Sequence, residues 1–258
     1  MKVEIAKNCG FCYGVRRAVD MASKATAGTH TLGPIIHNPQ VEQQLAQQGV
    51  TPIDNLRSVH AGETVLIRSH GVGPEVYEEA QEKKVQLVDA TCPHVKKAQQ
   101  DAKKIVSQEK KLVIIGEKNH PEVISISQWG VNRAIIIDKE EEAQEIPFCE
   151  DMGVVVQTTF SQEKFKRIVR ILQTKTNHLE THMTICTATQ QRQEAAIALA
   201  RRVDAMIVVG GKNSANTGRL AQVCREQDCP TYHVETAREI NPSWFHGMSY
   251  IGITAGAS

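Results

Sequence analysis

The sequence predicts an α/β protein built on parallel sheets. Short runs of β-branched and other apolar residues alternate with polar, helix-forming stretches along nearly the whole chain. These runs are continuously apolar, which is typical of strands covered on both faces of a sheet. With 258 residues, 41% of them hydrophobic and 23% charged, the chain has the composition of a folded globular protein. The predicted strands include residues 3–6, 64–68, 111–116, 134–138, 153–157, 205–210 and 250–254.

Composition excludes several classes of function. Thirty Lys and Arg residues stand against 29 Asp and Glu, which is too balanced for a protein that binds nucleic acid mainly through phosphates. Aromatic residues make up only 4%, so base-stacking surfaces are not expected. No apolar run approaches the roughly 20 residues that span a bilayer, and residues 1–10 lack the apolar region of a signal peptide. We therefore expect a soluble, cytoplasmic protein with no nucleic-acid or membrane partner.

A threefold internal repeat organises the chain. Each of three segments runs from a predicted strand into a cysteine and then a helix, and these cysteines are Cys12, Cys92 and Cys186. Apolar residues recur at helical spacing after the first two, whereas the third helix fits less closely. Equivalent positions recur at intervals of about 80 to 100 residues. The sequence predicts three similar α/β domains, at 1–90, 91–182 and 183–258, in a pseudo-threefold trefoil.

Each repeat adds two polar loops to its cysteine. In open parallel sheets, ligands collect beyond the carboxyl ends of the strands, so loops from the three repeats could converge on one central cavity. The first two repeats continue into predicted helices, at 76–84 and 163–172, whereas the third reaches Ser258 without one. The sequence therefore predicts a shared site between the repeats, with the helix of the third repeat missing.

The three repeated cysteines suit a metal cluster. A closed structural zinc site takes four ligands, commonly in close pairs, whereas three thiolates on a 4Fe–4S cluster leave one iron open to a substrate. Cys9 and Cys12 spell C-x-x-C, which could be a redox pair. Only Cys12 directly precedes the helix, so Cys9 is assigned no ligand role. The remaining cysteines, Cys149, Cys224 and Cys229, have no counterparts in the repeat.

A second group of repeated residues is polar and suits a phosphate. Imidazole, hydroxyl and amide groups at loop–helix junctions donate to phosphate oxygens, aided by free backbone N–H groups and the helix dipole. The chain has no P-loop pattern, so a nucleotide site of that kind is excluded. Each residue alone is more simply explained as a helix cap or turn residue, but their recurrence favours a binding site. The candidates are His37, His70, His120, Ser214, Asn216 and Ser258.

One carboxylate, Glu122, stands out in the segment Asn-His-Pro-Glu-Val. Its loop position directs it toward the expected cavity, where it could deliver protons. Taken alone, a glutamate is more often a solvated surface group.

Ordered motifs along the chain resemble those of the 4-hydroxy-3-methylbut-2-enyl diphosphate reductase family, the terminal iron–sulfur enzymes of the methylerythritol phosphate route to isoprenoids. The resemblance runs from residue 10 to residue 258. One departure is Ala215, where many members have a second serine, so one diphosphate hydrogen bond would come from backbone instead. The motifs are GFCYGVRRA, GPIIHNPQV, RSHGV, DATCPHV, NHPEV, QTTFSQ, ICTATQQRQ, GGKNSANTGRL and GITAGAS.

The resemblance implies a reaction and assigns residues to it. It implies reductive removal of an allylic hydroxyl from a diphosphate substrate, which gives isopentenyl and dimethylallyl diphosphate. Thr158 would lie near that hydroxyl, and Glu122 would belong to the proton relay. Electrons would come from ferredoxin or flavodoxin, since no flavin or nicotinamide motif is present. The metal ligands would be Cys12, Cys92 and Cys186 on one 4Fe–4S cluster, and the diphosphate would contact His37, His70, His120, Ser214, Asn216 and Ser258.

Three alternatives stay open at this point. Another three-cysteine iron–sulfur enzyme, of the quinolinate synthase type, would bind a dicarboxylate, for which more Arg or Lys is expected in the loops. A cluster-based sensor or binding protein for phosphorylated metabolites would not need Glu122. A zinc protein using Cys9 and Cys12 would be recognised by metal analysis.

Overall fold

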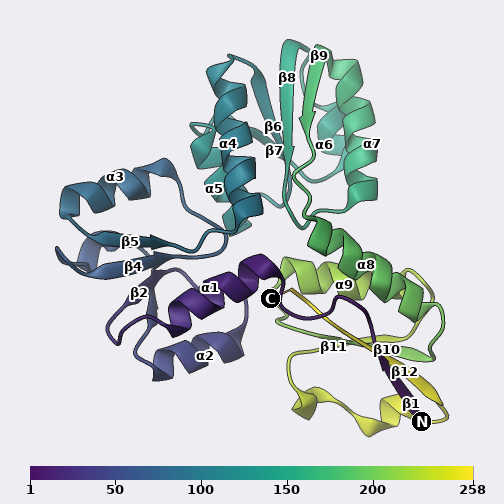
Figure 1. Cartoon of the computed structure of the whole chain (residues 1–258). Helices are drawn as coiled ribbons and strands as arrows, with labels where there is room; N and C mark the ends of the chain where they lie inside the picture. The colour runs from purple at the N-terminus through teal and green to yellow at the C-terminus, as the bar shows by residue number, and fades with distance from the viewer. Residues whose placement is uncertain (258) are drawn as a thin grey trace.

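The protein folds into three lobes around a common centre (Figure 1). The structure, a computed structural model, describes residues 1–257. Within this range it holds three sheets of four strands each, and every strand pairing is parallel. The predicted α/β class with three similar units is confirmed.

The three sheets share one strand order. The first sheet has the order β3-β2-β4-β5, the second β7-β6-β8-β9 and the third β11-β10-β12-β1. The strands are β1 Lys2–Ile5, β2 His30–Leu32, β3 Thr51–Ile53, β4 Thr64–Ile67, β5 Gln86–Asp89, β6 Lys111–Ile115, β7 Ile135–Ile137, β8 Cys149–Val156, β9 Thr176–His182, β10 Ala205–Val209, β11 Thr231–Val234 and β12 Tyr250–Ala255.

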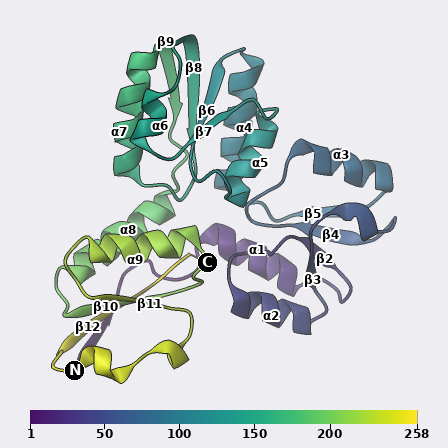
Figure 2. The same cartoon turned by 180° about the vertical axis from the view of Figure 1, so that it is seen from behind.

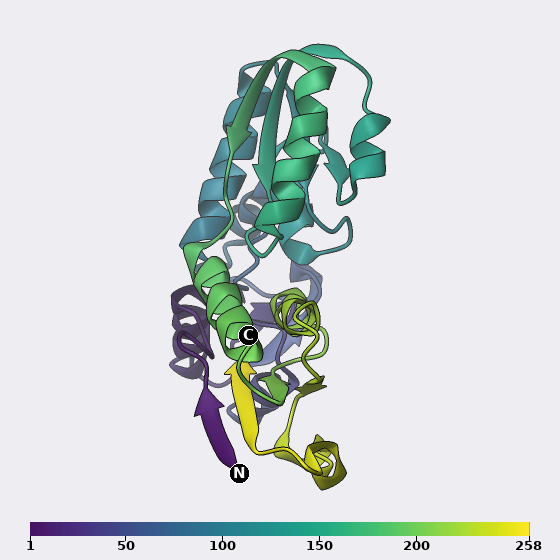
Figure 3. The same ribbon diagram turned by 90° about the vertical axis from the view of Figure 1, so that its right-hand side faces the viewer.

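The strand β1 lies outside the unit to which the sequence analysis assigned it. We expected residues 1–90 to form one domain, but Lys2–Ile5 pairs with Tyr250–Ile253 of β12 in the third sheet. There β1 occupies the edge position that β5 and β9 occupy in the other sheets. A β-branched run identifies a strand but not its partner, which is set by tertiary packing. Figure 3 shows these two strands side by side at the end of the molecule opposite the second lobe.

Helices cover the sheets, and three of them begin directly after a repeated cysteine. Figure 2 shows α1, α8 and α9 gathered where the three lobes meet. Three helices begin directly after Cys12, Cys92 and Cys186, as the repeat predicts. The helices are α1 Tyr13–Ser23, α2 Pro39–Gln47, α3 Pro74–Lys83, α4 Pro93–Ser107, α5 Pro121–Trp129, α6 Glu140–Gln144, α7 Gln162–Leu172, α8 Thr187–Ala200 and α9 Ala215–Arg225.

Each lobe is held by its own apolar core. The central strand β6 is buried after its first residue because helices cover both faces of the sheet; Leu112–Ile115 is no more than 1% exposed. None of the helices that the structure describes is long and apolar enough to cross a membrane.

Candidate functional site

The three repeated cysteines meet in one cavity. Cys12, Cys92 and Cys186 each occupy the position before the first turn of a helix, where backbone N–H groups are free to face a thiolate. All three line the same cavity of about 80 Å³ between the lobes. Cys9 is absent from the described residues that line it. The expected convergence of three loops from three repeats is therefore seen in the structure.

The fit between α1 and Cys92 is close. A Cβ atom on Gly14 would lie 2.5 Å from the Cys92 Sγ, so only glycine allows the first turn of α1 to approach this thiol. Burial, with a smaller contribution from the neighbouring thiols of Cys12 and Cys186, raises the pKa of the Cys92 thiol to about 11, against the opposing effect of backbone hydrogen bonds from His94 and Val95. Three crowded thiols of this kind form the donor set that a metal cation converts to thiolates.

Backbone hydrogen bonds fix two of the cysteines to the polar loops. The Cys92 N–H donates to the Ser69 carbonyl at 3.0 Å, and the Cys186 N–H donates to the Thr158 carbonyl at 3.0 Å. Each of these cysteines is therefore attached to the loop that follows a central strand, β4 or β8. This attachment places the sulfur ligands and the polar groups in the same space.

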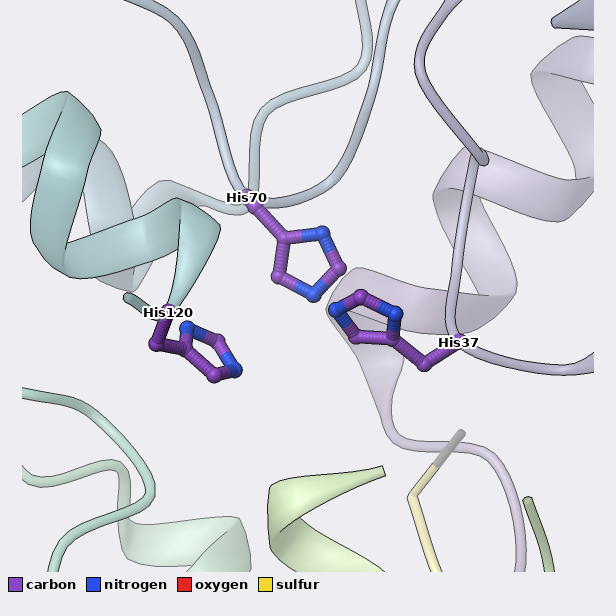
Figure 4. A group of neighbouring side chains, drawn as sticks. All are labelled: His37, His70 and His120. Carbon is purple, nitrogen blue, oxygen red and sulfur yellow. The ribbon is translucent and has the colours of Figure 1, made fainter. Parts of the chain in front are cut away.

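Three histidines from the polar loops face one another (Figure 4). The ring centroids of His37 and His70 are 4.4 Å apart, and His120 lies 5.8 Å from the first and 5.5 Å from the second. One ring nitrogen from each lies within 4.8 Å of the others. Buried polar atoms here have no hydrogen-bond partner among the described residues, and they are His37 Nε2, His70 Nδ1, Arg68 Nε and Asn216 Nδ2.

The histidines are neutral near neutral pH. Burial, then the charge of Arg68, lowers the pKa of His37; burial and the other imidazoles, together with Arg68, hold the pKa of His70 well below its usual range. Burial also lowers the pKa of His120 to about 4, with His37 and Arg68 contributing. Arg68 forms no ion pair among the described residues. Since its fixed charge disfavours further positive charge, the group is better suited to an anion than to a metal cation.

Glu122 and Thr158 form a buried acid–hydroxyl pair. The Thr158 N–H donates to Glu122 Oε1 at 2.6 Å, and the Thr158 hydroxyl donates to Oε2 at 2.8 Å. Both residues line the cysteine cavity, and Glu122 is only 2% exposed. Burial raises the pKa of Glu122 to about 7, against the opposing effect of the two Thr158 hydrogen bonds. The carboxyl group is thus set to exchange a proton near neutral pH.

The remaining candidates lie at the start of α9. Asn216 lines the cysteine cavity, while Ser214 and His120 line an adjoining cavity of about 430 Å³. Thr159 borders both cavities, so they are neighbours. Ser258 lies outside the described residues. Every other residue expected from the sequence is brought to this region.

Comparison with known proteins assigns the chain to a family. Residues 3–258 match the family described as LytB protein. The chain belongs to the LytB family. A relative from Pelobacter propionicus, named 4-hydroxy-3-methylbut-2-enyl diphosphate reductase, is 47% identical over all of this chain and 93% of its own length. A relative of the same name from Geobacter sulfurreducens is 46% identical over all of this chain and 92% of its own length.

Two solved structures support the assignment to the LytB family. The E-1-hydroxy-2-methyl-but-2-enyl-4-diphosphate reductase from Plasmodium falciparum is 28% identical, with a TM-score of 0.95 over all of this chain and 83% of its own. A second, (E)-4-hydroxy-3-methyl-but-2-enyl diphosphate reductase, described as the terminal enzyme of the non-mevalonate pathway, is 40% identical, with a TM-score of 0.72 over all of this chain and 94% of its own. Enzymes of this name are oxidoreductases. The resemblance of the motifs is thereby confirmed.

Two arginines of this LytB chain were missed by the sequence analysis. Arg68 lies beside the three histidines, and Arg192 lines the cysteine cavity. Both lie within motifs that resemble those of the reductase family, RSHGV and ICTATQQRQ, and this position in a motif could have identified them. Surface arginines are common, so residue type alone did not distinguish these two. The LytB match also removes the quinolinate synthase type from the alternatives.

Proposed function

We propose that this chain catalyses the reductive dehydroxylation of 4-hydroxy-3-methylbut-2-enyl diphosphate to isopentenyl and dimethylallyl diphosphate, the last step of the methylerythritol phosphate pathway. One observation carries the proposal. Three thiols and a buried acid–hydroxyl pair line one cavity where the three lobes meet. Beside it lies a group of three neutral histidines, with an arginine that forms no ion pair among the described residues. These groups match the three needs of the reaction, namely electrons, protons and a diphosphate site.

The thiols would hold one 4Fe–4S cluster with three protein ligands, Cys12, Cys92 and Cys186. Their shared cavity and the close approach of Gly14 to Cys92 support a cluster between the lobes rather than separate metal sites. When bound, such a cluster supplies single electrons and an iron without a protein ligand that acts as a Lewis acid. A zinc site built on Cys9 and Cys12 is disfavoured because Cys9 is not among the described residues that line this cavity.

The histidine group would bind the substrate's diphosphate. Its members are His37, His70 and His120, with Ser214 and Asn216 as further donors at the start of α9. Ser258, which lies outside the described residues, would be another donor. Neutral imidazoles donate hydrogen bonds without an added charge, and the Arg68 guanidinium supplies the fixed positive charge that an anion requires. The unpartnered nitrogens of His37, His70, Arg68 and Asn216 would gain acceptors from phosphate oxygens.

Glu122 and Thr158 would deliver protons. Removal of the hydroxyl as water and formation of the new C–H bond together consume two protons and two electrons. A hydroxyl both donates and accepts, so the 2.8 Å contact between Thr158 Oγ1 and Glu122 Oε2 lets a protonated Glu122 pass its proton outward through Thr158. The Thr158 carbonyl also holds the Cys186 N–H, which keeps this proton path beside the thiols. Burial of both residues excludes bulk water from the step.

An external carrier would bring the electrons. Ferredoxin or flavodoxin would fill this role in the cytoplasm, since each transfers single electrons and the proposed reaction needs two. The chain itself carries no flavin or nicotinamide motif.

The proposal is tested by turnover of the loaded enzyme. The chain is purified without oxygen and supplied with the diphosphate substrate and a chemical reductant, and the two products, which are isomers of equal mass, are separated by chromatography. Formation of both products at a rate that scales with cluster content is expected. A protein that is fully loaded with its cluster and binds the substrate without forming product would instead be a sensor or binding protein.

A further inference from the structure

Arg192 is a buried cation at the cysteine cavity that pairs with no carboxylate among the described residues. It is 6% exposed and lines the cavity together with Cys12, Cys92 and Cys186. None of the ion pairs among the described residues includes it. A buried arginine usually pairs with a carboxylate because an isolated buried charge is costly. A compensating negative charge is therefore expected inside this cavity.

The guanidinium group joins helix α8 to the loop before Cys12. Its Nε and Nη2 donate to the Gly10 carbonyl at 3.1 and 2.7 Å, and its Nη1 donates to the Ala188 carbonyl at 2.8 Å. Gly10 belongs to the loop that precedes Cys12, and Ala188 to the first turn of α8, directly after Cys186. One side chain thus connects the helix that follows Cys186 to the loop that precedes Cys12.

The backbone conformation at Gly10 presents its carbonyl to the Arg192 guanidinium. Gly10 has a φ of +80°, the left-handed region that favours glycine, and a Cβ there would meet no atom within 4 Å. Backbone conformation, rather than space, is therefore the reason for glycine. The Gly10 N–H donates to the Ala255 carbonyl at 3.2 Å, so third-repeat groups hold both sides of this peptide segment.

We propose that Arg192 is a positioning residue for the metal site: it latches the Cys12 loop to the Cys186 helix and places a fixed positive charge beside the thiolates. The inference rests on the proposed cluster. A cluster with three thiolate ligands carries net negative charge that increases on reduction, and its reduction potential responds to nearby charge and hydrogen bonding. Arg192 would therefore favour both retention of the cluster and its reduced form.

Two substitutions separate the hydrogen bonds that Arg192 makes to the two carbonyls from the positive charge that it carries. Arg192→Lys keeps a positive charge but loses the planar fork that binds two carbonyls, and Arg192→Gln loses the charge. We expect Arg192→Gln to lower the midpoint potential of the bound cluster, measured by a redox titration followed by absorbance and electron paramagnetic resonance. Arg192→Lys should keep the potential near that of the parent protein but lose iron faster to a chelator. Arg201→Gln, at the exposed end of the same chain segment, removes an equal charge and should change neither property.

A second measurement tests, in the metal-free protein, whether Arg192 holds the Cys12 loop close to the Cys186 helix. In the metal-free protein, phenylarsine oxide binds two thiols that lie close together. With Cys9, Cys92 and Cys229 replaced by Ser in every variant, Cys12 and Cys186 are the neighbouring thiols that remain to bind the arsenical. Arg192→Gln and Arg192→Lys should each weaken this binding at least about tenfold, whereas Arg201→Gln should not.

Either of two results would overturn the inference. One is an Arg192→Gln protein whose cluster has the parent's potential; the other is unchanged arsenical binding in the metal-free Arg192 variants. Failure of the proposed function itself would appear differently, as a parent protein that holds no cluster while its Arg192 variants still lose arsenical binding.

Discussion

Burial shifts the pKa values of the acid and the imidazoles at this site in opposite directions, and both shifts favour the uncharged form. Burial raises the pKa of Glu122 to about 7 and lowers that of His120 to about 4, so near neutral pH the imidazole is uncharged and the carboxyl is about half protonated. The fixed charges of the region then come from Arg68 and Arg192. This division suits a site that binds an anion and moves protons.

Replacing Glu122 by Gln tests the proton relay. Gln can still accept the hydrogen bond from the Thr158 N–H but cannot release a proton, so turnover should fall by roughly 100-fold or more. Cluster absorbance should be retained, because Glu122 is not one of the proposed ligands. The measurement is steady-state product formation with a chemical reductant. Normal turnover would remove Glu122 from the mechanism.

The same residue makes stability depend on pH. The folded protein holds the pKa of Glu122 at about 7 against an ordinary value of 4.5, so folding favours the protonated form. Its favourable contribution is complete below about pH 4.5 and is lost as the pH rises through 7, at a cost of up to about 3 kcal/mol.

Thermal unfolding of the metal-free protein measures this effect. Compared with Glu122→Gln, the parent protein should lose stability between pH 5 and pH 8. A difference between the two proteins that stays constant over this range would show that Glu122 is not buried as described.

Arg68 should control the affinity for the diphosphate group. Replacing it by Met removes the fixed charge beside the histidines, which should weaken binding of inorganic pyrophosphate by roughly 10- to 100-fold. Arg57, an exposed residue of the same repeat, provides the matched control when replaced by Gln. Calorimetric titration gives both affinities. Equal weakening in the two variants would mean that only the overall charge of the protein matters.

At the scale of elements, the helices that begin at cysteines organise the site, and one glycine tests their packing. Alanine normally stabilises a helix by up to about 1 kcal/mol relative to glycine. At Gly14, however, the added Cβ would lie 2.5 Å from the Cys92 Sγ and displace it. Gly14→Ala should therefore lower the iron content while helix content, measured by circular dichroism, is unchanged.

Gly218 in α9 is the matched control for this substitution. A Cβ there would meet no atom within 4 Å, so Gly218→Ala should retain the iron of the parent protein. If Gly14→Ala also retains it, the close approach of α1 to Cys92 is not needed for the metal site.

Elements and cysteine positions could be predicted from the sequence because both depend on local signals. Apolar runs marked the strands, and a cysteine before each helix recurred in register. The roles of Arg192 and Arg68 could not, because they depend on contacts made by folding; Arg192 meets Gly10 across 182 residues of chain. The pairing of β1 with β12 was missed for the same reason.

At the scale of the whole molecule, each cysteine helix reaches toward the segment before another cysteine. Arg17 of α1 donates to the Asp89 carbonyl ahead of Cys92. Asp101 of α4 lies 3.3 Å from the His182 ring ahead of Cys186, and Arg192 of α8 closes the circle at Gly10. With β1 in the third sheet, each of these contacts lies within one lobe. Each holds the cysteine helix of its lobe to the segment that leads into the next cysteine helix around the cavity.

Iron and acid-labile sulfide counts on the chain purified without oxygen test the central claim most directly. The account predicts about four of each per chain, lost when Cys12, Cys92 or Cys186 is replaced by Ser and kept when Cys9 is replaced. Stoichiometric zinc in place of iron, or a full cluster that survives loss of Cys92 or Cys186, would contradict it.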